Sequence, residues 1–102
     1  MKTVRVCYTT TAAFAPVNQK NIAAISNELK ELNHPGIKYS AWLLADGKTF
    51  THFDQLENEQ AHEVLTSLES FKKFDAQLAA SGLEAEPQLE LLSLVASTDV
   101  FF

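Results

Sequence analysis

The stretch KYSAWLLADGKTFTHFDQL, Lys38 to Leu56, contains two alternating apolar runs around one Asp-Gly pair. Asp46 and Gly47 favour a two-residue hairpin turn, because such a turn needs the positive φ values that this pair adopts easily. The turn fixes the cross-strand pairs, which are Ala45 with Lys48, Leu43 with Phe50, Ala41 with His52 and Tyr39 with Asp54. One face of the hairpin then carries Tyr39 and His52, and the opposite face carries Trp42 and Phe53.

Regular patterns also occur on both sides of the hairpin. Alternation with β-branched residues predicts a strand over 3–10. An apolar stripe at helical spacing, Ile22, Ile25, Leu29 and Leu32, predicts a helix with Asn18 as its N-cap. Helices are expected over 59–65 and 67–81, separated by a capping box of Thr66 and Glu69. The run QLELLSLVAS, 88–97, has apolar residues at both parities and predicts a last strand covered on both faces.

The order strand, helix, strand, strand, helix, strand predicts an α+β, ferredoxin-like βαββαβ fold with a four-stranded antiparallel sheet. A chain of 102 residues fits one domain, 1–102. Two helices cover only one face of such a sheet, while the strands carry large apolar groups on both faces. A second copy of the sheet is the economical cover, so we expect a homodimer.

Charge and motifs restrict the partners. The net charge is −5 and the eight basic residues are scattered, which argues against nucleic acid and anionic membranes as partners. Cys7 is the only cysteine, no signal-peptide pattern or membrane span is present, and a cytoplasmic protein is expected. No metal-ligand spacing, phosphate loop or dinucleotide fingerprint occurs, so neither a metal nor a cofactor is predicted.

Five residues are candidates for a site. His52 is the candidate acid/base, because an imidazole titrates near neutral pH, and Tyr39 and Asp54 share its face. Tyr8 on the first strand and Tyr39 offer hydroxyl groups to a ligand. Trp42 and Phe50 are candidate walls. Each also has an ordinary structural interpretation: His52 as a hydrogen-bonded strand residue, Tyr8 as a hydroxyl bonded to backbone, and Trp42 as core or dimer contact.

Three stretches resemble the dimeric α/β-barrel superfamily, in particular small bacterial proteins similar to antibiotic biosynthesis monooxygenases. They are the hairpin YSAWLLADGKTFTHF, the segment LTSLESFKKFDAQL and the closing LELLSLVAS. The resemblance implies two sheets packed face to face in a homodimeric barrel, with a cavity in each subunit between sheet and helices. The superfamily includes cofactor-independent oxygenases of electron-rich aromatic molecules, isomerases and haem-degrading enzymes. Haem degradation is disfavoured, because the first strand lacks the Asn typical of that group.

Two functions are compatible with these residues and with the resemblance. The first is a homodimer that binds a small apolar or aromatic molecule and has monooxygenase-like or isomerase-like chemistry. The alternative is a non-catalytic dimeric ligand-binding or regulatory module. A cavity of about 300 Å³ or more favours the first, and an interior at crystal-like packing density favours the second.

Overall fold

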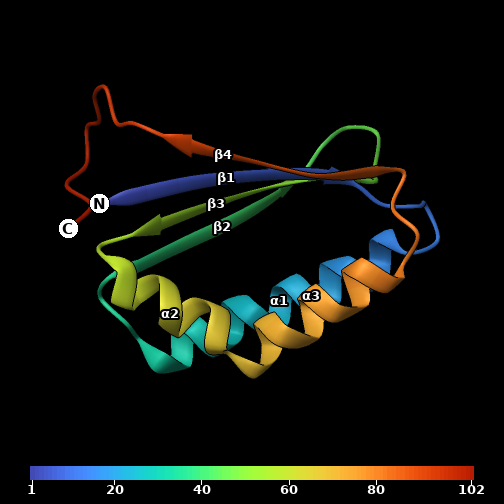
Figure 1. Ribbon diagram of the computed structural model, residues 1–102, viewed down its shortest axis with the longest axis horizontal. Coiled ribbons are helices and arrows are strands. Elements are labelled where there is room, and N and C mark those ends of the chain that lie inside the picture. The colour runs from blue at the N-terminus through green and yellow to red at the C-terminus, as the bar shows by residue number, and fades with distance from the viewer.

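The computed structural model describes residues 1–102 and consists of two layers, a sheet and a layer of helices (Figure 1). The elements in chain order are β1 (Lys2–Thr9), α1 (Ala15–Leu32), β2 (Ile37–Leu43), β3 (Thr49–Leu56), α2 (Glu59–Ser67), α3 (Glu69–Ala80) and β4 (Ala85–Leu92). The strands lie in the order β2-β3-β1-β4, with every neighbouring pair antiparallel. The predicted α+β, ferredoxin-like βαββαβ fold is confirmed, with its second helical segment divided into α2 and α3.

The predicted hairpin register is confirmed. Leu43 pairs with Phe50, Ala41 with His52 and Tyr39 with Asp54. The predicted two-residue turn is wrong, because the Leu44 N–H donates to the Thr49 carbonyl and leaves four residues in the loop. Only Gly47 has a positive φ there, at 77°. The Asp46 carboxylate accepts from the Lys48 and Thr49 N–H groups, which stabilises the longer loop without changing the register.

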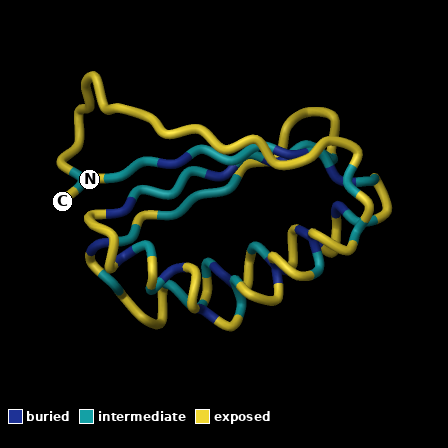
Figure 2. The backbone as a smooth tube through the Cα atoms, viewed as in Figure 1, coloured by how far each residue is buried: buried dark blue, intermediate teal, exposed yellow.

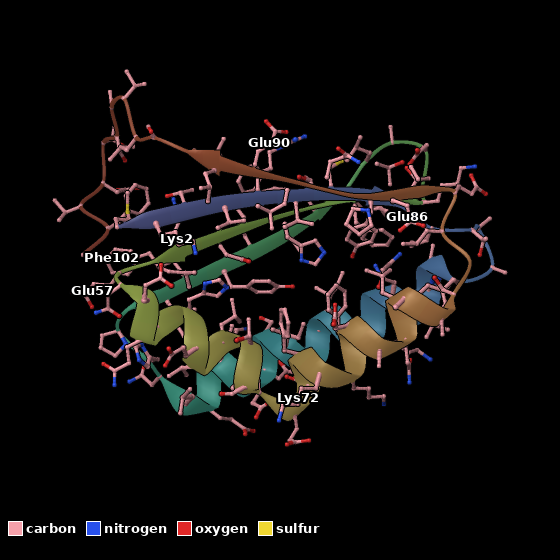
Figure 3. The ribbon with its side chains drawn as sticks, in the orientation of Figure 1. Lys2, Glu57, Lys72, Glu86, Glu90 and Phe102 are labelled. Atoms are coloured by element: carbon pink, nitrogen blue, oxygen red, sulfur yellow. The ribbon has the colours of Figure 1, made fainter.

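The sheet face that carries Tyr39 and His52 packs against the helices. The alternation of residues along the strands could not predict which face does so. The largest fully buried residues of the core between the layers are Tyr8, Phe50, Ile25, Leu56 and Leu65. Each large aliphatic side chain buried in this way contributes about 1.5–3 kcal/mol of hydrophobic stabilisation. Side chains from both layers project into this space (Figure 3).

The start of α1 and the break between α2 and α3 differ from expectation. Helix α1 begins at Ala15 rather than at an Asn18 cap, and Pro16 occupies its first turn, where a missing N–H costs nothing. The break between α2 and α3 is Leu68, which has extended backbone angles, and not a Thr66–Glu69 capping box. The Thr66 hydroxyl instead donates to the carbonyls of its own helix.

Strand β4 differs most from the expected elements. It spans Ala85–Leu92 rather than 88–97, and every one of its residues is exposed (Figure 2). Leu89 and Leu91 lie on the helix side of the sheet, opposite Val6 and Val4, yet they are 66% and 69% exposed. The expected cover on both faces is therefore absent within one chain, because the helix layer does not extend under this edge strand.

Candidate functional site

The site is a cavity of about 240 Å³ between the sheet and α3. The sheet contributes Tyr8, Tyr39, His52 and Asp54, and α3 contributes an aromatic wall of Phe71 and Phe74. Leu89 of the exposed strand β4 and Asp75 of α3 also line it. No lysine or arginine is among the lining residues.

Its size fits a small ring compound. An apolar cavity of about 150 Å³ in another protein accommodates benzene, and typical ligand pockets occupy about 300–1,000 Å³. At about 240 Å³ the cavity is smaller than the 300 Å³ expected for a ligand site, but larger than the benzene-binding cavity. The space is suited to a molecule of one or two aromatic rings.

A chain of hydrogen bonds runs through the wall formed by the sheet. The Asn18 amide donates to the Tyr8 hydroxyl over 2.8 Å. The Tyr8 hydroxyl lies 2.7 Å from Nε2 of His52, and the Tyr39 hydroxyl lies 3.0 Å from Nδ1 of the same ring. Four elements are involved, since Asn18 is on α1, Tyr8 on β1, Tyr39 on β2 and His52 on β3.

The donors along this chain can be assigned from the need to satisfy buried hydroxyls. Tyr8 is only 2% exposed and already accepts from Asn18, so its own hydrogen is donated to His52 Nε2. His52 then carries its hydrogen on Nδ1 and donates it to the Tyr39 oxygen. The Tyr39 hydrogen has no protein acceptor in this chain, so it is available to a molecule in the cavity.

Burial shifts the pKa values of all four titratable groups of the sheet wall. It lowers the pKa of His52 to about 4, so the imidazole is neutral at pH 7. It raises the pKa values of Tyr8 and Tyr39 well above the usual range, which keeps both hydroxyls protonated. It raises the pKa of Asp54 to about 6, and Oδ1 of this carboxylate is buried without any hydrogen-bond partner.

The structure brings three of the five candidate residues together. Tyr8, Tyr39 and His52 line the same cavity. Phe50 is in the core, where its ring stacks on Tyr8 with a centroid distance of 5.7 Å, and does not line the cavity. Trp42 lies on the opposite face, 60% exposed, and borders a shallower hollow of about 170 Å³ at the β2 edge, together with Phe50.

Sequence reasoning gave too little weight to two residues of the site. Asn18 was expected as a helix cap, but it lies fully buried in the first turns of α1 and orients Tyr8. Asp54 was considered only as a neighbour that could orient His52. Its place on the cavity was detectable, because alternation puts it on the face of His52 and opposite Tyr39.

Other classes of site are not evident in the fold. No group of three or more His, Cys, Asp or Glu side chains is arranged to bind a metal ion. None of the helices has the length and apolar character needed to span a membrane.

The similarity of this chain to known proteins is detected in the structure and not in the sequence. Neither a family model nor a curated protein matches the sequence. A solved structure of an antibiotic biosynthesis monooxygenase superposes with a TM-score of 0.74 at 10% identity, covering 94% of this chain and 100% of that chain. The chain has the fold of the antibiotic biosynthesis monooxygenases. This confirms, for the fold, the resemblance seen in the hairpin and in the segments that follow it.

Two bacterial proteins provisionally named as antibiotic biosynthesis monooxygenases have the same fold. The one from Nitrosomonas europaea has a TM-score of 0.78 at 8% identity, and the alignment covers 96% of this chain and 93% of that one. The one from Caulobacter crescentus has a TM-score of 0.75 at 18% identity, with coverages of 93% and 90%. At these identities the likeness describes the fold alone.

Proposed function

We propose that this protein binds a small apolar or aromatic molecule in the cavity between sheet and α3. We further propose cofactor-independent chemistry of the monooxygenase-like or isomerase-like kind, which starts with removal of a proton from the ligand. The observation that supports this most is the convergence of the Tyr8–His52–Tyr39 chain and the Asp54 carboxylate on one aromatic-walled cavity. The monooxygenase fold supports the same choice.

The residues have different roles in this proposal. Tyr39 presents its hydroxyl hydrogen to an oxygen of the ligand, where it would stabilise developing negative charge. His52 is a positioning residue, because both its nitrogens are occupied by tyrosine hydroxyls and its pKa of about 4 makes it a weak base. This differs from the expectation that His52 itself is the acid/base. Phe71 and Phe74 provide the apolar surface for a ring.

We propose also that the protein is a homodimer whose two sheets pack through the faces that the helices leave open. Phe53 lies in the middle of this face, and the 60% exposed Trp42 belongs to the same side of the sheet. The Arg5–Glu90 ion pair, 2.8 Å between Nη1 and Oε1, lies across the same face, and Glu90 projects away from the helices (Figure 3). A second sheet would bury the aromatic groups and enclose this pair.

One observation favours the non-catalytic alternative. Both ring nitrogens of His52 are hydrogen-bonded within the protein, as is usual for a buried histidine that stabilises the fold. In that case the cavity would hold a ligand without changing it, and the chain would be a dimeric binding or regulatory module.

A native mass spectrum of untagged protein, purified from cells, tests the dimer and the ligand together. We expect a species of twice the 11.3 kDa chain mass that carries a small additional mass. Phe53→Glu should shift this species to single chains, because it buries a charge in the proposed interface without a partner. Lys72→Glu is the control, since Lys72 projects from α3 away from the sheet (Figure 3). A bare dimer favours the non-catalytic module, and a monomeric wild type contradicts the two-sheet arrangement.

A further inference from the structure

The Asp54 carboxylate is the one acidic group on the sheet side of the cavity. It lies directly across the β2–β3 ladder from Tyr39 and two positions along β3 from His52, on the same face. Side chains at directly paired positions have Cβ atoms about 4.5–5.5 Å apart, so Asp54 and the Tyr39 hydroxyl approach the same ligand. One is an acceptor and the other a donor.

Asp54 lacks the partners that a buried carboxylate usually has. Its Oδ1 atom is inaccessible and accepts no hydrogen bond, and no cationic side chain lines the cavity. Buried carboxylates are normally paired with a cation or accept several hydrogen bonds. The second oxygen, Oδ2, also accepts no hydrogen bond but is not enclosed in the same way, so a molecule in the cavity can donate to the carboxylate at Oδ2.

The other polar groups of the cavity are already engaged or face outward. Both nitrogens of His52 are bonded to tyrosine hydroxyls, and Tyr8 is bonded to Asn18 as well. Asp75 on α3 is exposed at the rim.

On the α2 side, the one basic side chain that precedes β1 residue Val4, Lys2, is already bonded to two residues of α2. The Lys2 ammonium lies 3.4 Å from the Glu59 carboxylate and 3.1 Å from the His62 ring. Asp54 is therefore the only acceptor on the sheet side that remains free for a ligand.

We propose that Asp54 accepts the proton of the ligand, and that the cavity therefore takes neutral aromatic molecules with an O–H or N–H donor and excludes their carboxylate analogues. This inference rests on the proposed function of the cavity. In the proton transfer, the O–H or N–H bond of the ligand breaks and an O–H bond forms on Asp54. The electron pair stays on the ligand atom, so the negative charge moves from Asp54 to the ligand, where the Tyr39 hydroxyl can donate to it.

Charge explains the selectivity. A ligand carboxylate would lie close to the ionised Asp54 in a site with no compensating cation, and like charges in such a site repel strongly. A neutral hydroxyl of the same shape instead donates a hydrogen bond to Oδ2, the carboxylate oxygen that the fold does not enclose. The raised pKa of Asp54, about 6 because of burial, also places this group near the pH at which a general base is effective.

The test compares two probes of matched shape, 2-naphthol and 2-naphthoate, by calorimetric titration of the full chain. At about pH 8 we expect the wild type to bind 2-naphthol at least about tenfold more tightly than 2-naphthoate. Asp54→Asn should reduce this preference to about twofold or less, because it removes the charge and keeps the shape. Asp75→Asn is the matched control at the rim and should leave most of the preference intact.

The wild type alone provides a second arm that does not depend on the folding of a variant. Near pH 5.5 Asp54 takes up its proton while a carboxylic acid with an ordinary pKa of about 4 stays ionised, so the preference for 2-naphthol should narrow. Equal binding of the two probes at pH 8, or an unchanged preference in Asp54→Asn, overturns the assignment of Asp54 and leaves the cavity as a ligand site. Failure of both probes to bind the wild type overturns the proposed function and this inference with it.

Discussion

His52→Ala is expected to lower the free energy of unfolding by about 3–5 kcal/mol at pH 7, the range found when buried aromatic rings are truncated. The ring is 4% exposed and packs against Phe74 with a centroid distance of 5.4 Å. Its loss also removes the acceptor of the Tyr8 hydrogen and the donor to the Tyr39 oxygen, which places the expected change toward the upper end of this range. Urea unfolding followed by circular dichroism measures the change.

His62→Ala is the matched control for this substitution. His62 on α2 is half-exposed and its ring bonds only to the side chains of Lys2 and Glu59, so its removal should change the free energy of unfolding by less than about 1 kcal/mol. A loss below about 1 kcal/mol for His52→Ala would show that the hydrogen-bonded chain does not stabilise the fold.

Asp54→Asn is expected to raise the free energy of unfolding by about 2 kcal/mol at pH 8. The pKa of Asp54 rises from 3.8 to about 6 on folding, and a difference of about two pKa units corresponds to about 3 kcal/mol. The ionised Asp54 carboxylate therefore destabilises the folded state. This destabilisation is present above pH 6 and is removed as the pH falls toward 4. The buried amide of asparagine offsets part of the gain. Such a gain at a cavity residue is typical of a group kept for function.

The pH dependence distinguishes Asp54 from His52. The pKa of His52 falls from 6.5 to about 4 on folding, so its contribution to stability is lost as the pH falls through that window. In the wild type the two groups oppose each other between pH 6.5 and 4, and stability changes little. In Asp54→Asn only the His52 contribution remains, so stability should fall steadily toward pH 4. A variant less stable than the wild type at pH 8 would identify Asp54 as a structural acceptor instead.

The sequence was sufficient to predict those features for which the residue pattern allows only one arrangement. The hairpin register follows from alternation around a single turn, and it survived although the turn has four residues instead of two. The topology follows from the order of the segments. The helix stripe is confirmed at Ile25, which is fully buried, while Leu32 at its end is 48% exposed.

The remainder depends on tertiary contacts that local patterns do not contain. Because both faces of the strands carry large apolar groups, alternation could not determine whether Tyr39 or Trp42 faces the helices. The end of β4 depends on where pairing with β1 stops, at Leu92 opposite Thr3, and not on the apolar run that continues beyond it. Asn18 resembles a helix cap until the start of α1 at Ala15 places it inside the helix, against Tyr8.

The most direct test of the ligand site is a heteronuclear NMR titration of the protein with 2-naphthol. Trp42 is the only tryptophan and lies on the face of the sheet opposite the cavity. Its single indole N–H signal is therefore the control for binding outside the cavity. We predict saturable shifts for the resonances of Val6, Phe74 and Leu89, which line the cavity, and an unchanged Trp42 indole signal. Shifts at the Trp42 indole with the cavity resonances unmoved would contradict the assignment of this cavity as the binding site.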